Sequence, residues 1–127
     1  MKIKLSSVMV DDQEKALAFY TEVLGFKKKE DIPMGSVKWL TVVSPDGPDD
    51  IELLLEPMGF PPAKVYQKEL FEAGIPSTAF AVGDIQSEFE RLVKRGVVFK
   101  SEPTDAGPTK VAVFEDPCGN LIQIYQD

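Results

Sequence analysis

The chain contains an internal repeat, and this feature constrains its fold more than any other. Asp12 and Asp84 each precede an apolar pattern with helical spacing. A glycine ends each pattern, as Gly25 in the first copy and Gly96 in the second, at nearly the same interval from its aspartate. Aspartate is a preferred N-cap and glycine a preferred C-terminal cap, so each pair predicts one helix with both of its ends. A repeat of this kind predicts two copies of one supersecondary unit.

The strands expected around these helices follow the same order in both copies. The last strand of each copy follows a turn, and its polar residue is Glu52 in "IELLLE" and Gln123 in "NLIQIYQ". The interval from Asp12 to Glu52 nearly equals the interval from Asp84 to Gln123. Alternating and β-branched stretches predict the strands of both copies, at 3–10, 26–32, 36–44, 51–56, 76–82, 97–101, 109–115 and 120–126.

The predicted class is therefore α+β, with two tandem β-α-β-β-β modules in one domain of 127 residues. We expect the first module at 1–57, a linker at 58–74 and the second module at 75–127. The linker begins as a Pro-Gly loop, and "AKVYQKELFEAG" within it predicts a short helix.

Composition excludes several functional classes. The chain has 14 basic and 21 acidic residues, a net charge of −7, and a single basic cluster at 27–29, so nucleic acid is not an expected partner. Apolar runs reach about five residues, whereas a membrane helix needs roughly 20. The chain has no histidine, and Cys118 is its one cysteine. We expect a cytoplasmic protein without a disulfide framework.

The stretches "VDDQEKALAFYTEVLGF" and "DPCGNLIQI", within the tandem repeat, resemble the vicinal oxygen chelate superfamily. That superfamily includes glyoxalase I, extradiol dioxygenases and bleomycin resistance proteins. The resemblance covers nearly the whole chain. It implies a curled mixed sheet around a cavity, and a homodimer.

The resemblance also implies four positions that bind one divalent metal ion in the metal-dependent branches. They map onto Leu5, Glu52, Ser77 and Gln123 in this chain. Leucine donates no electron pair, and a neutral serine or glutamine is a weak ligand. Three protein ligands are typical of a catalytic transition metal. We therefore expect no metal at this place and no cofactor.

Strand alternation then predicts which side chains line the cavity implied by the resemblance. The expected ligand-binding set combines small, apolar and a few polar side chains, as small-molecule pockets do: Leu5, Ser7, Trp39, Glu52, Leu54, Ser77, Gln123 and Tyr125. Glu52 has two interpretations. In the functional interpretation, Glu52 binds a cationic ligand or acts as a general base. In the structural interpretation, it is a carboxylate satisfied by a Ser, Tyr or Lys neighbour. Trp39 is either a core residue or a platform for a flat or cationic ligand.

Three functional hypotheses remain open at the level of sequence. The first is a bleomycin-resistance-like protein that binds and sequesters a small cationic or aromatic molecule without the usual metal. The second is an isomerase, epimerase or lyase in which Glu52 is the catalytic base, with or without an unusual metal. The third is a regulatory or partner-binding module. Fold alone does not distinguish them.

Overall fold

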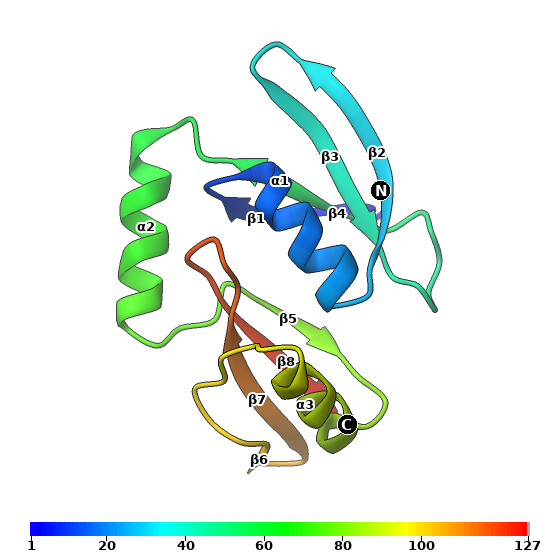
Figure 1. Ribbon diagram of the computed structural model, residues 1–127, viewed down its shortest axis with the longest axis vertical. Helices are drawn as coiled ribbons and strands as arrows, with labels where there is room; N and C mark the ends of the chain where they lie inside the picture. The colour runs from blue at the N-terminus through cyan, green and yellow to red at the C-terminus, as the bar shows by residue number, and fades with distance from the viewer. Residues whose placement is uncertain (127) are drawn as a thin grey trace. The chain divides into compact units, whose positions relative to one another are not determined.

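A computed structural model describes residues 1–126 as two compact units, 1–64 and 65 onwards (Figure 1). Each unit contains one mixed four-stranded sheet with a helix packed against it, so the predicted α+β class and tandem modules are confirmed. The strand orders are β1-β4-β3-β2 and β5-β8-β7-β6. In each sheet the first strand of the module pairs in parallel with the last, and the remaining neighbours are antiparallel.

The first unit follows the predicted order closely. Its elements are β1 (Leu5–Val10), α1 (Gln13–Ala18), a π-helical turn η1 (Phe19–Val23), β2 (Lys27–Met34), β3 (Val37–Val43) and β4 (Glu52–Pro57). The Asp12 side chain accepts a hydrogen bond from the Lys15 backbone N–H at 3.0 Å, which confirms the predicted cap. The helix, expected to continue uniformly to Gly25, instead widens into η1 after Ala18.

Alternation along the strands sorts the first unit into two faces. One face is buried and apolar, and its residues include Val8, Val10, Leu40, Val42 and Leu55. Ala16 and Tyr20, on α1 and η1, are fully buried as well, and α1 contacts β4. The helix therefore covers this face of the sheet, and the opposite face carries the other residue of each strand pair.

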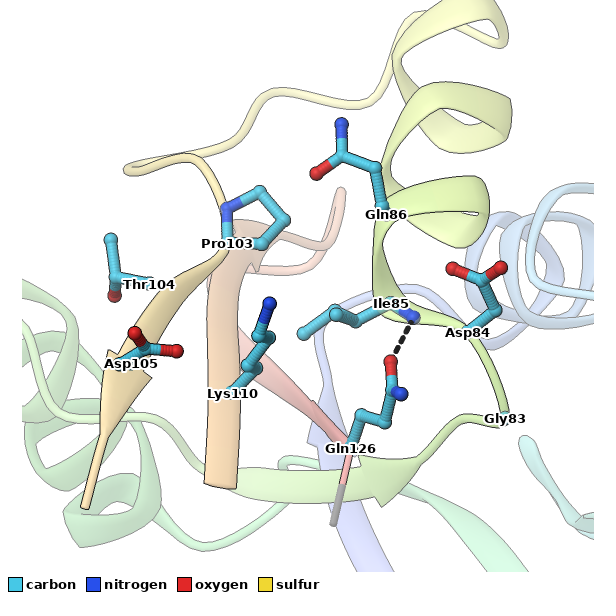
Figure 2. A pocket seen from close by; sticks show the side chains of 9 residues that line it. All are labelled: Gly83, Asp84, Ile85, Gln86, Pro103, Thr104, Asp105, Lys110 and Gln126. Carbon is cyan, nitrogen blue, oxygen red and sulfur yellow. Dashed lines mark hydrogen bonds between the residues drawn. The ribbon is translucent and has the colours of Figure 1, made fainter. Parts of the chain in front are cut away.

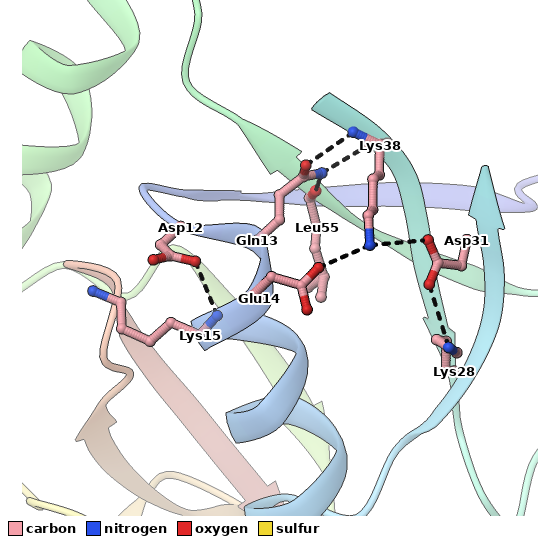
Figure 3. A network of polar contacts seen from close by, with 8 residues as sticks. All are labelled: Asp12, Gln13, Glu14, Lys15, Lys28, Asp31, Lys38 and Leu55. Carbon is pink, nitrogen blue, oxygen red and sulfur yellow. Dashed lines mark hydrogen bonds and ion pairs between the residues drawn. The ribbon is translucent and has the colours of Figure 1, made fainter. Parts of the chain in front are cut away.

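Gln13 fastens the start of α1 to the sheet (Figure 3). Its carboxamide accepts from the Lys38 N–H at 3.0 Å and donates to the carbonyls of Lys38, at 2.8 Å, and Leu55, at 3.0 Å. The pairing of β3 with β4 ends at Thr41 and Leu54, just before these groups. Gln13 thus satisfies peptide groups on two strands at the point where they stop pairing with each other.

An ion-pair chain lies beside this contact, also shown in Figure 3. The Lys38 ammonium lies 2.9 Å from Glu14 Oε1 and 3.5 Å from Asp31 Oδ1, and Lys28 lies 3.3 Å from Asp31 Oδ2. The hydrogen bond from Lys28 and the charge of Lys38 lower the pKa of Asp31. The hydrogen bond to Glu14 and the charge of Asp31 raise the pKa of Lys38. These exposed pairs link α1 to the β2–β3 hairpin.

The second unit contains part of α2 (Pro61–Glu72), followed by β5 (Thr78–Ala81), α3 (Ile85–Lys94), β6 (Thr104–Ala106), β7 (Thr109–Glu115) and β8 (Leu121–Gln126). The Asp84 carboxylate accepts from the Ser87 N–H at 3.1 Å, so the second predicted cap is also confirmed. That bond, together with one from the Ser87 hydroxyl, lowers the pKa of Asp84. The predicted linker helix is α2.

The strand expected at 97–101 is not formed. Phe99 makes a single antiparallel bridge to Phe114, and β6 begins only at Thr104. The ring of Phe99 lies 4.7 Å from that of Phe89 on α3 and 5.3 Å from that of Phe114 on β7. These aromatic contacts place α3 on the face that carries Phe114, which is fully buried. Val97 is buried and Val98 is 56% exposed, and the segment is joined to β7 by two backbone hydrogen bonds, from the Lys100 N–H to the Val113 carbonyl and from the Glu115 N–H to the Val98 carbonyl.

Candidate ligand-binding face

The side of the first sheet opposite α1 carries the residues that the sequence predicted as a ligand site. Trp39, Thr41 and Val43 alternate along β3, Glu52 and Leu54 along β4, and Leu5 and Ser7 along β1. The backbone register sets Leu5 beside Glu52, Ser7 beside Leu54, Thr41 beside Leu54 and Val43 beside Glu52. Because paired residues of a sheet project to the same side, the five predicted residues of this unit share one face. We call it the Glu52 face.

Glu52 begins β4, one of the two inner strands of the sheet, and both of its carboxylate oxygens have partners. The Thr41 hydroxyl donates to its Oε1 at 2.7 Å, and the Lys29 ammonium lies 3.6 Å from its Oε2. The Glu52 side chain is 22% exposed, whereas Thr41 is fully buried. The lysine partner fits the structural interpretation of Glu52, and the remaining exposure leaves the carboxylate accessible to a ligand.

A β-bulge brings Lys29 to this position. The pairing of β2 with β3 shifts between Lys28 and Asp31, so that Lys29 and Glu30 lie opposite the single residue Thr41. The Glu30 N–H donates to the Thr41 hydroxyl at 3.1 Å, which leaves that hydroxyl oriented to donate to Glu52. Sequence reasoning missed Thr41 and Lys29. The alternation that selected Trp39 also points to Thr41, but no sequence signal locates the bulge.

The apolar part of the face is only partly covered. Leu5 is 45% exposed, Trp39 is half-buried, and Ile32, the partner of Trp39 on β2, is 48% exposed. The indole of Trp39 and the carboxylate of Glu52 lie on one sheet surface, four residues apart along β3 because Glu52 pairs with Val43, and they offer a flat apolar contact and a negative charge.

In the second unit, Gln123 and Tyr125 lie on the sheet face opposite α3. Gln123 pairs with Ala79 and Val113, and Tyr125 pairs with Ala81 and Val111. These neighbours are small or branched apolar residues, and both polar side chains are half-buried. The predicted alternation of β8 is therefore correct, with Ile122 and Ile124 buried on the other face.

Ser77 has a different environment from the one expected of a strand residue lining a cavity. It precedes β5, and its hydroxyl donates to Asn120 Oδ1 at 3.1 Å. Gln67 of α2 donates to the same oxygen at 3.0 Å, and the Asn120 amide donates to Asp116 Oδ2 at 2.8 Å. Asp116 Oδ1 also accepts from the Cys118 and Asn120 N–H groups. The "DPCGN" turn is thus the centre of a buried hydrogen-bond network, which sequence reasoning missed.

The strand pairing also changes the correspondence between the two copies. Ser7 and Ala79 occupy the same position relative to their helix caps, Asp12 and Asp84, and they pair with Leu54 and Gln123. Leu54, rather than Glu52, is therefore the counterpart of Gln123. The antiparallel pairing gives the same correspondence. Thr41 on β3 pairs with Leu54, and Val113 on β7 pairs with Gln123. The connection between the last two strands is longer in the first copy, which explains why residue counting misaligned them.

The four positions implied for a family metal do not fit one. Leu5 has no donor atom, Ser77 already donates its hydroxyl proton to Asn120, and Glu52 is paired with a lysine. The positions that the strand pairing makes equivalent to Gln123 and its neighbour are Ser7, Leu54 and Ala79. Together they add only one hydroxyl group to the possible metal ligands. Within residues 1–126, no group of three or more cysteine, aspartate or glutamate side chains is arranged to hold a metal ion.

A separate hollow of about 550 Å³ lies in the second unit, where α3 begins (Figure 2). Its lining is mostly polar and comes from the start of α3, from β6 and from β7: Gly83, Asp84, Ile85, Gln86, Pro103, Thr104, Asp105, Lys110 and Gln126. Within this lining, Gln126 accepts a hydrogen bond from the Ile85 N–H at 2.7 Å. None of the predicted site residues lines this hollow.

Among residues 1–126, no helix is long and apolar enough to cross a membrane. The family model that matches the chain is that of the glyoxalase/bleomycin resistance protein/dioxygenase superfamily, and it spans residues 2–124.

Individual proteins agree with this match. The chain is 58% identical over 126 residues to YurT of Bacillus subtilis, with 99% of each chain covered. It is 30% identical to a lactoylglutathione lyase of Neisseria meningitidis, covering 99% of this chain and 91% of that enzyme. Among solved structures, TnmS3, an antibiotic binding protein from Streptomyces, superimposes with a TM-score of 0.77 at 31% identity and covers 99% of this chain and 95% of its own.

Proposed function

Because the chain belongs to the glyoxalase/bleomycin resistance protein/dioxygenase superfamily, we propose that it binds a small planar molecule and sequesters it without a metal ion. The ligand is cationic, aromatic or both. The observation that carries the proposal is the Glu52 face, where a partly exposed carboxylate shares one sheet surface with an indole and exposed apolar side chains. The similarity to an antibiotic binding protein supports binding over turnover.

Each part of the Glu52 face has a role in this proposal. Glu52 attracts the positive charge, Trp39 supplies a flat surface for stacking, Leu5 and Leu54 supply apolar contact, and Ser7 supplies a hydroxyl group. On the sheet of the second unit, taken by itself, the side chains of Gln123 and Tyr125 are the proposed hydrogen-bonding groups for a ligand. No step needs a metal or another cofactor. The proposal includes a cytoplasmic location and a homodimer. Light scattering of the purified protein tests the homodimer.

Calorimetric titration with a panel of planar aromatic amidines and their neutral amide analogues tests the binding. The amidines are expected to bind more tightly than the amides of the same outline. Replacing Glu52 by Gln should weaken amidine binding by about tenfold, since it removes a charge-assisted interaction, and leave the amides unchanged. Glu14→Gln is the matched control, because it removes the same charge and a lysine ion pair from α1, which covers the opposite face of the same sheet. Equal binding of amidines and amides, unaffected by Glu52→Gln, would refute the role of Glu52.

The second candidate function is an isomerase, epimerase or lyase with Glu52 as general base. The identity to a lactoylglutathione lyase across nearly the whole chain supports it. Mass spectrometry of each bound compound after prolonged incubation separates the two functions. Sequestration predicts that the compound is recovered unchanged. A product that forms with the natural protein and not with Glu52→Gln, while binding persists, would establish the enzyme.

A further inference from the structure

The Glu52 face contains its own positively charged group. Lys29 lies on the bulge of β2 and is not one of the residues that the sequence selected. Its ammonium group lies 3.6 Å from Glu52 Oε2 and also donates a hydrogen bond to the backbone carbonyl of Asp49, in the loop before β4. A carboxylate oxygen and a carbonyl oxygen therefore surround one cation that belongs to the protein itself.

The geometry of this pair differs from that of a tight ion pair. Charge-assisted N–H···O bonds are typically about 2.7–2.9 Å long, whereas Lys29 and Glu52 are separated by 3.6 Å. The hydrogen bond of the ammonium is made to Asp49 instead. The Lys29 and Glu52 side chains are 31% and 22% exposed, so water screens their attraction. Pairs of this kind change an equilibrium constant by roughly fivefold or less.

The other oxygen of Glu52 is held far more firmly. Oε1 accepts from the Thr41 hydroxyl at 2.7 Å, and Thr41 is fully buried and oriented by the Glu30 N–H. The carboxylate is therefore fixed in place on one side and weakly paired on the other. Displacement of Lys29 leaves Glu52 in position, and the ammonium keeps a partner in the Asp49 carbonyl.

From this arrangement we propose that Lys29 is the specificity-determining residue of the Glu52 face, a resident cation that a ligand cation must displace. The inference rests on the proposed function and narrows its ligand class. The ligand that displaces Lys29 is a planar cation with N–H donors, such as an amidinium or guanidinium group, because it can form the short bonds to Glu52 Oε2 that the lysine does not form. Neutral aromatic molecules and cations without N–H donors leave the lysine in place.

The test compares benzamidine with the neutral benzamide, by calorimetry at low ionic strength, on the natural protein and on Lys29→Met. Removal of the competing ammonium should strengthen benzamidine binding by about threefold to fivefold and leave benzamide unchanged. Lys28→Met is the matched control. It removes the same charge and an ion pair from the neighbouring position of β2, but Lys28 pairs with Val42, whose side chain lies on the helix-covered face.

Lys29→Gln provides a second variant that retains a donor for the Asp49 carbonyl and removes the charge, and it should behave as Lys29→Met does. Benzamidine binding that is unchanged or weakened in both Lys29 variants, while Glu52→Gln still weakens it, would overturn the inference and leave the proposed function intact. Absence of benzamidine and benzamide binding to every one of these proteins would overturn the proposed function together with the inference. An equal gain in Lys28→Met would show a general charge effect and would also overturn the inference.

Discussion

Asn120 is a polar residue whose loss should strongly destabilise the second unit. Its side chain accepts from Gln67 at 3.0 Å and from Ser77 at 3.1 Å, and it donates to the Asp116 carboxylate at 2.8 Å. Asn120 is 2% exposed, and Asp116 is 6% exposed, so water cannot readily replace these bonds. Asn120→Ala removes all three and leaves the Gln67 amide and the Asp116 carboxylate without this partner in a buried site.

The size of the effect follows from the three bonds. A hydrogen bond to a buried charge contributes about 1.5–3 kcal/mol, and a neutral one about 1 kcal/mol. The bond to Ser77 counts for less, since Ser77 is exposed. We therefore expect Asn120→Ala to lower the free energy of unfolding by about 3 kcal/mol. With a urea dependence of about 2 kcal/mol/M, the unfolding midpoint should fall by about 1.5 M, measured by far-ultraviolet circular dichroism.

Two further variants test the reasoning behind this number. Ser77→Ala removes one exposed bond and should cost about 1 kcal/mol or less. Asn120→Asp places a second carboxylate against Asp116, so the folded protein holds a proton between them and the pKa of the pair rises above the ordinary value. A raised carboxyl pKa stabilises the fold at low pH, and Asn120→Asp should regain stability from neutral to mildly acidic pH. A loss below about 1 kcal/mol for Asn120→Ala, or an Asn120→Asp variant indifferent to pH, would refute the argument.

Three other predictions concern the remaining contacts. Gln13→Ala should destabilise the protein by about 2 kcal/mol, because it removes three partly buried hydrogen bonds between α1 and the sheet; urea unfolding measures this. Asp31 has a lowered pKa, first through its hydrogen bond from Lys28, so its stabilisation is complete above the ordinary carboxyl pKa and disappears as the pH falls through the folded value; Asp31→Asn should flatten that acid-dependent part of the stability curve. Gly119→Ala should cost about 2 kcal/mol in the same unfolding assay, since φ is +90° and the added carbon would lie 3.0 Å from the Gln67 amide oxygen; a neutral effect would contradict that geometry.

The sequence predicted much of this fold because its strongest signals are local. The caps at Asp12 and Asp84 depend on side chains that lie close in sequence to the backbone groups that they bind. Strand alternation depends on neighbours in the same strand, and it assigned Glu52, Trp39 and Gln123 to faces opposite their helices.

The features that the sequence did not predict arise from contacts between distant segments. Gln67 and Asn120 are 53 residues apart, and Lys29 reaches Glu52 only because a bulge rotates β2. The correspondence of Glu52 with Gln123 failed for a related reason. Counting residues cannot separate a longer loop from a shifted strand, whereas backbone pairing does so directly.

The placement of Trp39 and Cys118 gives the protein one natural probe in each unit. Trp39 is its single tryptophan, on the sheet of the first unit, and Cys118 is its single cysteine, 1% exposed within the turn of the second. A thiol reagent reaches Cys118 only when that turn opens. The rate of thiol labelling therefore reports how often the second unit opens. Indole fluorescence follows the first unit in the same sample. The two signals, recorded together on the unmodified sequence, measure whether the duplicated modules unfold as one cooperative body or as two.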